Sequence, residues 1–76
     1  MEMLQLKYFY ESAQNESFAK TAKKYMVPTT SVSASVRRLE TELGAPLFDR
    51  TGNSITLNAK GREFFASIKH IFTELD

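Results

Sequence analysis

The chain has 76 residues, no cysteine and a formal net charge of +1. The lack of cysteine excludes disulfide bonds and thiolate-bound zinc. A chain of this length forms one small domain with a marginal core, so we expect it to gain stability from a partner, most simply a second copy of itself. No apolar run approaches the roughly 20 residues of a membrane span, and the N-terminal stretch lacks the basic and apolar regions of a signal peptide, so a cytoplasmic protein is expected.

Basic residues are concentrated in one part of the chain. Between Ser17 and Leu39 there is no acidic residue, but there are five basic ones: Lys20, Lys23, Lys24, Arg37 and Arg38. The net charge alone predicts no general attraction to a polyanion. A locally basic face on a nearly neutral molecule is, however, what a protein that binds a nucleic-acid groove needs.

Two amphipathic helices are predicted in the first third of the chain. The first covers about residues 3–14, where an apolar stripe with helical spacing is formed by Leu4, Leu6, Phe9, Tyr10 and Ala13. Asn15 and Glu16 interrupt this pattern. Ser17 can then cap a second, shorter helix over residues 18–25. A short helix followed by a tight turn and another helix is the pattern of a helix-turn-helix.

Residues 28–44 predict a third helix with two different faces. One stripe is apolar and is expected to face the core; it consists of Val32, Val36, Leu39 and Leu43. The opposite stripe carries short side chains followed by a long basic one: Thr30, Ser33, Ala34 and Arg37. A DNA backbone could approach such a face closely. The alternative is an ordinary solvated amphipathic helix.

The ends of this third helix carry recognisable signals. Pro28 is tolerated at or before the first turn, and Thr29, Thr30 or Ser31 is expected to cap the free amide groups. Gly44 is expected to end the helix in a left-handed conformation. Free amides and the positive end of the helix dipole attract phosphate, which suits a helix that enters the major groove with its N-terminus leading.

A short hairpin is predicted after the third helix. Residues 49–51 and 55–57 have the pattern of two very short strands, joined by turn-forming residues at Gly52, Asn53 and Ser54. Leu47 and Phe48, directly before the hairpin, are expected to fill the core. An isolated hairpin of this kind, called a wing, is marginal in water, so it should be mobile unless it docks on the helices or on a ligand.

A fourth helix is predicted from Ala59 to the end of the chain, with Asn58 as its N-cap. Six large apolar residues form two adjoining stripes on this helix: Phe64, Phe65, Ile68, Ile71, Phe72 and Leu75. Burial stabilises each such side chain by roughly 1.5–3 kcal/mol, so several exposed ones favour association. We therefore expect the six residues to form a homodimer interface. The stripe could instead pack entirely against the first three helices.

Residues 4–61 resemble, in register and without gaps, the N-terminal winged helix-turn-helix of the LysR-type transcriptional regulators. The most specific segments are RRLETELGAPLFDR, residues 37–50, and the N-cap-x-x-Gly pattern of Asn58 and Gly61. The resemblance implies a mainly α fold with a three-helix core, a short two-stranded wing and a long C-terminal linker or dimerisation helix.

The resemblance also implies a function and a domain organisation. Residues 1–58 would be a bacterial DNA-binding domain, and residues 59–76 the linker helix through which two subunits dimerise on an inverted repeat of double-stranded DNA. In the family a larger effector-binding domain follows. The chain therefore resembles a fragment, and any small-molecule effector would act only through that further domain.

Four positions, in three places along the chain, depart from the residues that similar proteins use to read bases. The family often has a glutamine and then a proline where Thr29 and Thr30 stand, an arginine at the position of Ala34, and an arginine in the wing at the position of Asn53. These departures remove long bidentate readers, each worth about 1–3 kcal/mol of discrimination. Base readout is therefore expected from hydroxyl groups, thymine methyl contacts or bridging water, at Thr29, Thr30, Ser33, Ala34 and Ser35.

A second set of residues is expected to hold phosphates or to form the wing contact, which fixes the register without reading sequence. It comprises Ser17, Lys20, Ser31, Arg37, Arg38, Arg50, Thr51 and Asn53. Two alternatives are open. Arg37 and Arg38 could pair with Glu40 and Glu42 along the helix, at about 0.2–0.5 kcal/mol per pair. Arg50 could instead tie the wing to the helices through Asp49 or a carbonyl group.

Two other functional classes compete with DNA binding. Enzymatic activity is not expected, because the single histidine, His70, has no cysteine or acidic pair opposite it and no glycine-rich phosphate loop is present. No cofactor or metal is expected either. A protein-interaction or dimerisation module without specific DNA readout is the more serious alternative. It would have no need of both the acid-free basic stretch and the wing, and its binding would lose little to added salt.

Overall fold

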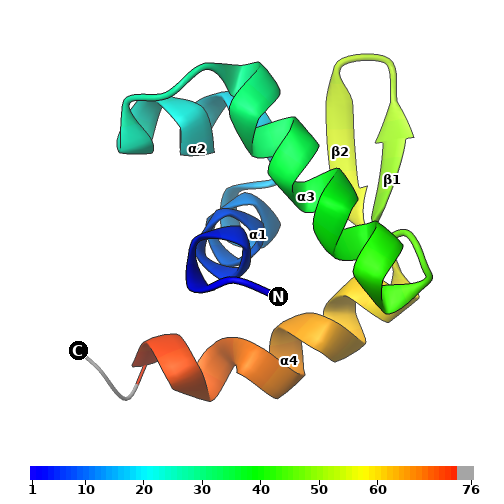
Figure 1. Cartoon of the computed structure of the whole chain (residues 1–76). Helices are drawn as coiled ribbons and strands as arrows, with labels where there is room; N and C mark the ends of the chain where they lie inside the picture. Colours follow the sequence, from blue (N-terminus) through cyan, green and yellow to red (C-terminus); the bar gives the residue numbers. More distant parts are fainter. Residues whose placement is uncertain (74–76) are drawn as a thin grey trace.

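The computed structural model describes residues 1–73, which form four helices and a two-stranded antiparallel sheet (Figure 1). In chain order the elements are α1 (Met3–Asn15), α2 (Phe18–Tyr25), α3 (Thr29–Leu43), β1 (Phe48–Thr51), β2 (Ser54–Leu57) and α4 (Ala59–Thr73). This is a winged helix-turn-helix, which confirms the predicted fold class. Within residues 1–73 no helix is long and apolar enough to cross a membrane.

The core lies where α1 meets the other elements. α1 packs against α2, α3 and α4, and Phe9 on α1 is fully buried against Leu39 on α3 and Leu47 in the following loop. A second, smaller cluster joins Tyr8 and Val32 with residues of α2. Because the apolar stripes of α1 and α3 converge on one core, α3 has only its opposite face free.

The helix ends follow the sequence signals in most places. The hydroxyl of Ser17 accepts a hydrogen bond of 3.1 Å from the amide of Lys20, and Gly44 ends α3 with φ +77°. The expectation that Thr29, Thr30 or Ser31 caps α3 was wrong. Pro28 occupies the N-cap position, and its ring has no acceptor to offer, so no side chain caps the first turn.

The wing is docked on the helices rather than free. Each strand is one residue longer than predicted, and Phe48 and Ile55 turn their side chains into the core. Arg50 lies opposite Ile55 in the register, so both side chains point to the same face of the hairpin. This docking on helices is the condition under which the wing was expected to be ordered.

α4 begins as predicted, because the Asn58 side-chain oxygen accepts a hydrogen bond of 2.7 Å from the amide of Gly61. Much of its apolar face is covered by α1. The ring of Tyr10 stacks on Phe65 and Phe72, with centroid distances of 5.0 and 4.7 Å. Ile68 is only 7% exposed. It is therefore a core residue, and its assignment to a dimer interface was wrong.

The other residues of that predicted interface have mixed positions. Four are half-buried and pack partly against the core: Phe64, Phe65, Ile71 and Phe72. Leu75 lies outside the described residues. The alternative, in which the stripe packs against the helices of the same chain, is therefore correct in part. α1 provides most of that packing.

Candidate nucleic-acid interface

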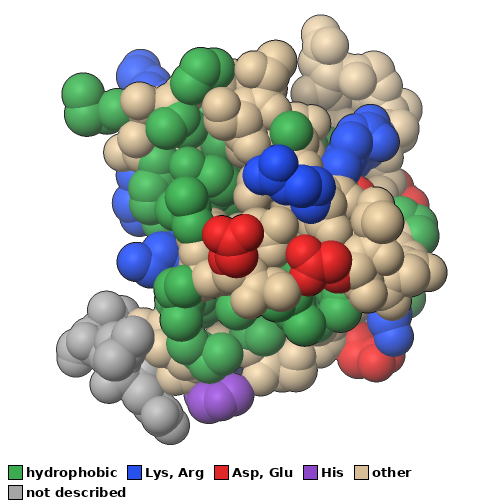
Figure 2. All heavy atoms as spheres, viewed as in Figure 1, with side chains coloured by type: hydrophobic (Ala, Val, Ile, Leu, Met, Phe, Trp, Pro, Cys, Tyr) green, Lys and Arg blue, Asp and Glu red, His purple; other side chains and the backbone are tan. Residues whose placement is uncertain are grey.

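The start of α3 and the turn of the wing lie at the same edge of the molecule, uppermost in Figure 1. α4 runs along the opposite edge, and the single histidine, His70, lies there as well (Figures 1 and 2). On the face drawn in Figure 2 the basic side chains are interspersed with apolar and acidic ones. Together with the net charge of +1, this distribution means that any attraction for DNA is local and not a property of the whole surface.

The predicted base-contact residues fall into two groups. Thr29, Thr30 and Ala34 are exposed and Ser33 is half-buried, so all four present atoms at the free face of α3. Ser35 is only 4% exposed and belongs to the inward side of the helix. Its assignment to base readout was wrong, because a step of about 100° per residue places it next to the apolar stripe.

The N-terminus of α3 keeps its capacity to donate. No side chain caps the first turn, and the amide of Ser31 turns back to the Pro28 carbonyl at 3.0 Å. Thr29 and Thr30, at the first two positions, are exposed. An uncapped N-terminus with exposed hydroxyl side chains can donate hydrogen bonds to phosphate or to base acceptors.

Arg37 and Arg38 do not form the ion pairs along α3 that were considered as an alternative. Glu40 pairs instead with Arg50 at 2.9 Å, and Glu42 pairs with the amino group of Met1. A hydrogen bond from that amino group lowers the pKa of the Glu42 carboxyl, and Arg38 adds a smaller attraction. Both arginines are exposed, and neither side chain forms an ion pair in the described part of the chain.

The lysines of α2 are not equivalent. Lys24 forms an ion pair of 2.6 Å with Glu11 of α1, and this hydrogen bond is the main cause of the raised pKa of Lys24. Lys20 and Lys23 are exposed and form no ion pair with the described residues. Ser17 beside them already uses its oxygen as the cap of α2, so only its hydroxyl hydrogen is left to donate.

Arg50 is held inside the domain. Its guanidinium donates to Glu40 at 2.9 Å and lies 5.4 Å from the centre of the Phe18 ring. These contacts favour the structural alternative for Arg50, with Glu40 as the partner rather than Asp49. The second oxygen of Glu40 accepts a hydrogen bond of 2.7 Å from the amide of Leu47. The part played by Glu40 was missed in the sequence, since both partners come from another segment.

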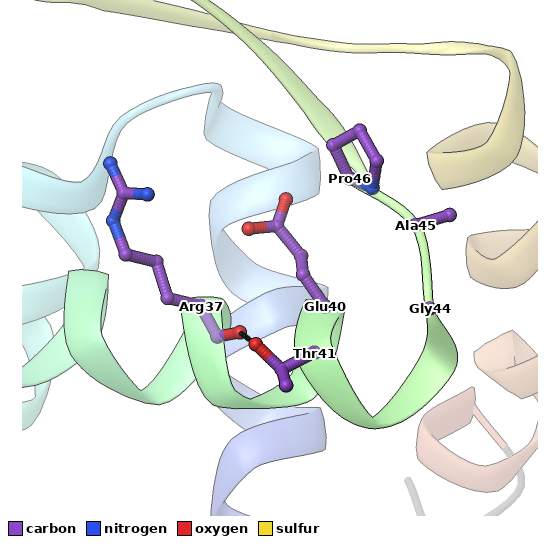
Figure 3. A pocket seen from close by; sticks show the side chains of 6 residues that line it. All are labelled: Arg37, Glu40, Thr41, Gly44, Ala45 and Pro46. Atoms are coloured by element: carbon purple, nitrogen blue, oxygen red, sulfur yellow. Dashed lines mark hydrogen bonds between the residues drawn. The ribbon is translucent and has the colours of Figure 1, made fainter.

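A shallow depression of about 370 Å³ lies between the second half of α3 and the loop that follows it (Figure 3). It is lined by Arg37, Glu40, Thr41, Gly44, Ala45 and Pro46. In Figure 3 the Arg37 and Glu40 side chains extend from the same side of α3 toward the wing. The lining comes from the second half of α3 and from the loop after it, away from the exposed threonines at the helix start. Among residues 1–73 no group of three metal-ligating side chains comes together.

Thr51, Gly52 and Asn53 are exposed at the tip of the wing, and Gly52 has φ +59°. The wing tip and the start of α3 thus lie at one edge (Figure 1), and the predicted contact residues other than Ser35 and Arg50 are exposed, apart from the half-buried Ser17 and Ser33. We call this set of residues the groove surface: Ser17, Lys20, Thr29, Thr30, Ser31, Ser33, Ala34, Arg37, Arg38, Thr51 and Asn53. An uncapped helix with a hydrophilic face and an adjacent wing defines a DNA-binding domain of the winged helix-turn-helix class.

Comparison with known proteins identifies the family. Residues 3–62 match the family described as bacterial regulatory helix-turn-helix protein, lysR family. The HTH-type transcriptional regulator YybE of Bacillus subtilis strain 168 is 40% identical over 74 residues, which are 97% of this chain and 25% of that protein. This chain thus belongs to the LysR family of transcriptional regulators, whose DNA-binding domain it provides, and it spans about a quarter of the length of the curated relatives it matches.

Two solved structures agree in fold. The complex of the CbnR DNA-binding domain with DNA has a TM-score of 0.89 and 32% identity, and the match covers 99% of this chain and 86% of that chain. The complex of the BenM DNA-binding domain with benA site 1 DNA has a TM-score of 0.89 and 28% identity, covering 100% and 88%. Relatives of this chain are thus transcriptional regulators rather than enzymes.

Proposed function

We propose that the groove surface binds double-stranded DNA in a sequence-specific manner, with the first half of α3 in the major groove and the wing tip at the adjacent minor groove. The observation that carries this proposal is the shared edge of the α3 N-terminus and the wing turn (Figure 1). A helix and a hairpin tip at one edge can enter neighbouring grooves of one duplex, and the LysR-family relatives CbnR and BenM are described as DNA complexes.

Base readout in this proposal relies on short side chains. Thr29, Thr30 and Ser33 can accept or donate through hydroxyl groups, and Ala34 can contact a thymine methyl. Asn53 at the wing tip takes the minor-groove position. Each of these contacts carries less discrimination than a bidentate arginine or glutamine, so water and DNA shape contribute more to the choice of site.

Phosphate contacts provide most of the affinity in this proposal. Arg37 and Arg38 are exposed on α3 and unpaired within residues 1–73, and Lys20 is exposed on α2. Each neutralised phosphate releases counterions, so binding should weaken steeply as salt is raised. Ser17, Ser31 and Thr51 add hydroxyl donors on the same surface.

We also propose that the protein acts as a homodimer through α4 on an inverted repeat. The half-buried residues Phe64, Phe65, Ile71 and Phe72 keep part of their surface for a second copy. The division into residues 1–58 and 59–76 is then one of function, because α4 also contributes Ile68 to the shared core. Half-sites would lie about one helical turn apart.

The relatives are about four times longer than this chain, so effector sensing is assigned to the part of such a protein beyond residue 76. A regulator that binds DNA in a bacterium works in the cytoplasm, and we place the protein there. Neither a cofactor nor a metal has a part in the proposal. Activation or repression of transcription would depend on where the operator lies.

The experiment that tests this function is selection of bound duplexes from a random pool across a salt titration. Enrichment of an inverted repeat, with affinity that falls steeply with salt, is the expected result. Weak binding without enrichment and with little salt dependence would contradict the proposal. That result would favour a protein-interaction module in which α4 is the binding element.

A further inference from the structure

Arg50 and Glu40 connect three elements of the domain. Arg50 projects from β1, lies over the Phe18 ring at the start of α2 and donates to Glu40 on α3 at 2.9 Å. The side chains of Arg50 and Glu40 are only 23% and 11% exposed. The second Glu40 oxygen holds the amide of Leu47 at 2.7 Å, just before β1 begins. Glu40 therefore contacts both the entrance of the wing and its middle.

The position of Arg50 along the wing matters as much as its partners. Arg50 pairs with Ile55 in the register, and both side chains face the helices. The next pair, Thr51 with Ser54, is exposed and begins the tip. Arg50 and Ile55 are thus the last inward-facing pair before the tip. Ile55 packs in the core without a directional contact, whereas the Arg50–Glu40 ion pair fixes an orientation relative to α3.

We propose that Glu40 and Arg50 are positioning residues that fix the wing tip at one orientation relative to the base-contact half of α3, so that both reach a single DNA site. The inference depends on the proposed DNA binding for its function. In this role neither Glu40 nor Arg50 contacts DNA. Glu40 acts on the flanking base positions under the wing through Arg50, and it leaves the positions under α3 unaffected.

The same ion pair permits a different role. A DNA phosphate could replace Glu40 as the partner of Arg50, which would make Arg50 a direct phosphate contact. The two roles predict opposite effects of removing the Glu40 charge. A positioning role predicts a loss of flanking preference, whereas release of Arg50 predicts equal or tighter binding with unchanged preference.

The test compares the wild type with Glu40→Gln and with the double variant Glu40→Gln/Arg50→Met. The glutamine that replaces Glu40 can still accept from the Leu47 amide, and a methionine keeps an apolar stem against Phe18, so the double variant leaves no buried charge unpaired. Lys69→Met is the matched control, because Lys69 is an exposed cation on α4. Thermal melting of each variant checks that it is folded. Arg50→Lys keeps the positive charge and should retain part of the preference at the flanking base positions.

Two readouts are measured. In random-pool selection the double variant should retain the base preference under α3 within about twofold, while affinity falls about tenfold and preference at the flanking positions is lost, because one set of groove contacts disappears. In the free domain, the backbone amide order parameters of Gly52 and Asn53 should fall while those of α3 remain unchanged. The Lys69→Met control should change neither readout.

Two results would overturn the inference. One is unchanged flanking preference in both Glu40 variants; equal or tighter binding by the single variant Glu40→Gln would then favour release of Arg50 to a phosphate. The other is unchanged order parameters at the wing tip. Failure of the wild type to bind any duplex would overturn the proposed function instead, and the order parameters of the free domain would still decide whether Glu40 and Arg50 orient the wing.

Discussion

The hydroxyl of Ser12 on α1 donates a hydrogen bond of 2.9 Å to the hydroxyl of Thr21 on α2, and both side chains are fully buried. Thr21 in turn donates to the carbonyl of Ser17 at 3.1 Å. Every hydroxyl proton in this chain of bonds therefore has an acceptor. Because the bond crosses from α1 to α2, it fixes how the first helix of the helix-turn-helix lies on the rest of the core.

A double-mutant cycle on this pair should show coupling. Ser12→Ala leaves Thr21 its own acceptor and should cost about 1 kcal/mol, whereas Thr21→Val strands the buried Ser12 proton and should cost about 2 kcal/mol. Removing both groups leaves no buried hydroxyl donor without an acceptor, so the double variant should cost less than the sum of the two. Urea unfolding measures all three values. Strict additivity would mean that the two hydroxyls are independent.

Substitution of Gly61 should be severely destabilising. A Cβ at Gly61 would collide with the backbone carbonyl of Leu47 and would lie 2.7 Å from the Leu57 Cδ1. A backbone carbonyl held in the core cannot move aside, so Gly61→Ala should cost about 3 kcal/mol or more. Gly52→Ala is the control, since a Cβ there meets nothing within 4 Å and the cost is only that of φ +59°. Equal losses of unfolding free energy would contradict the steric argument.

Met26 offers a stabilising change. It ends α2 with φ +57°, a conformation that favours glycine, and its side chain is 91% exposed. Met26→Gly relieves this strain without removing buried surface and should raise the free energy of unfolding by about 0.5–1 kcal/mol. Thermal and urea denaturation test this expectation. Destabilisation would mean that the methionine packs in a way that its exposure does not reveal.

Local chemistry explains why much of the fold was predictable. The caps at Ser17 and Asn58 and the stop at Gly44 depend on the residue and its immediate neighbours, and all three are present. The exception at the start of α3 is also local. Pro28 can take the capping position but cannot accept a hydrogen bond, so the neighbouring threonines do not act as caps.

Partners that are distant in sequence were not predictable by the same reasoning. A rule for neighbouring turns pairs Glu40 with Arg37, yet Glu40 meets the Leu47 amide and Arg50, seven and ten residues away. Likewise, helical spacing reveals an apolar face on α4 but not that Tyr10 covers part of it. The choice of partner depends on tertiary packing, so the partners of Glu40 and the covered part of the α4 face could be assigned only from the structure.

Two hydroxyl residues on different faces of α3 should have separable effects on DNA binding. Thr30 is exposed and Ser35 is buried. Thr30→Ala should change the preferred base at one position by about 1 kcal/mol or more while leaving the salt dependence of affinity unchanged. Ser35→Ala should leave the preferred sequence unchanged. A shift in site preference for Ser35→Ala, measured by random-pool selection, would show that the inward position of Ser35 changes on binding.

A cation of the groove surface and a cation outside it should differ in their effect on the salt dependence of DNA binding. Arg37 is exposed without an ion pair in the described residues, whereas Lys24 is paired with Glu11 at 2.6 Å. Arg37→Ala should weaken binding to all duplexes and reduce the slope of log affinity against log salt by about one, because one phosphate is no longer neutralised. Lys24→Ala also removes one positive charge but should leave the slope nearly unchanged, since Glu11 already pairs with that amine.

Equal slopes for wild type and Arg37→Ala would refute the phosphate role of Arg37. Equal changes for both variants would mean that total charge, rather than the placement of Arg37, determines the affinity.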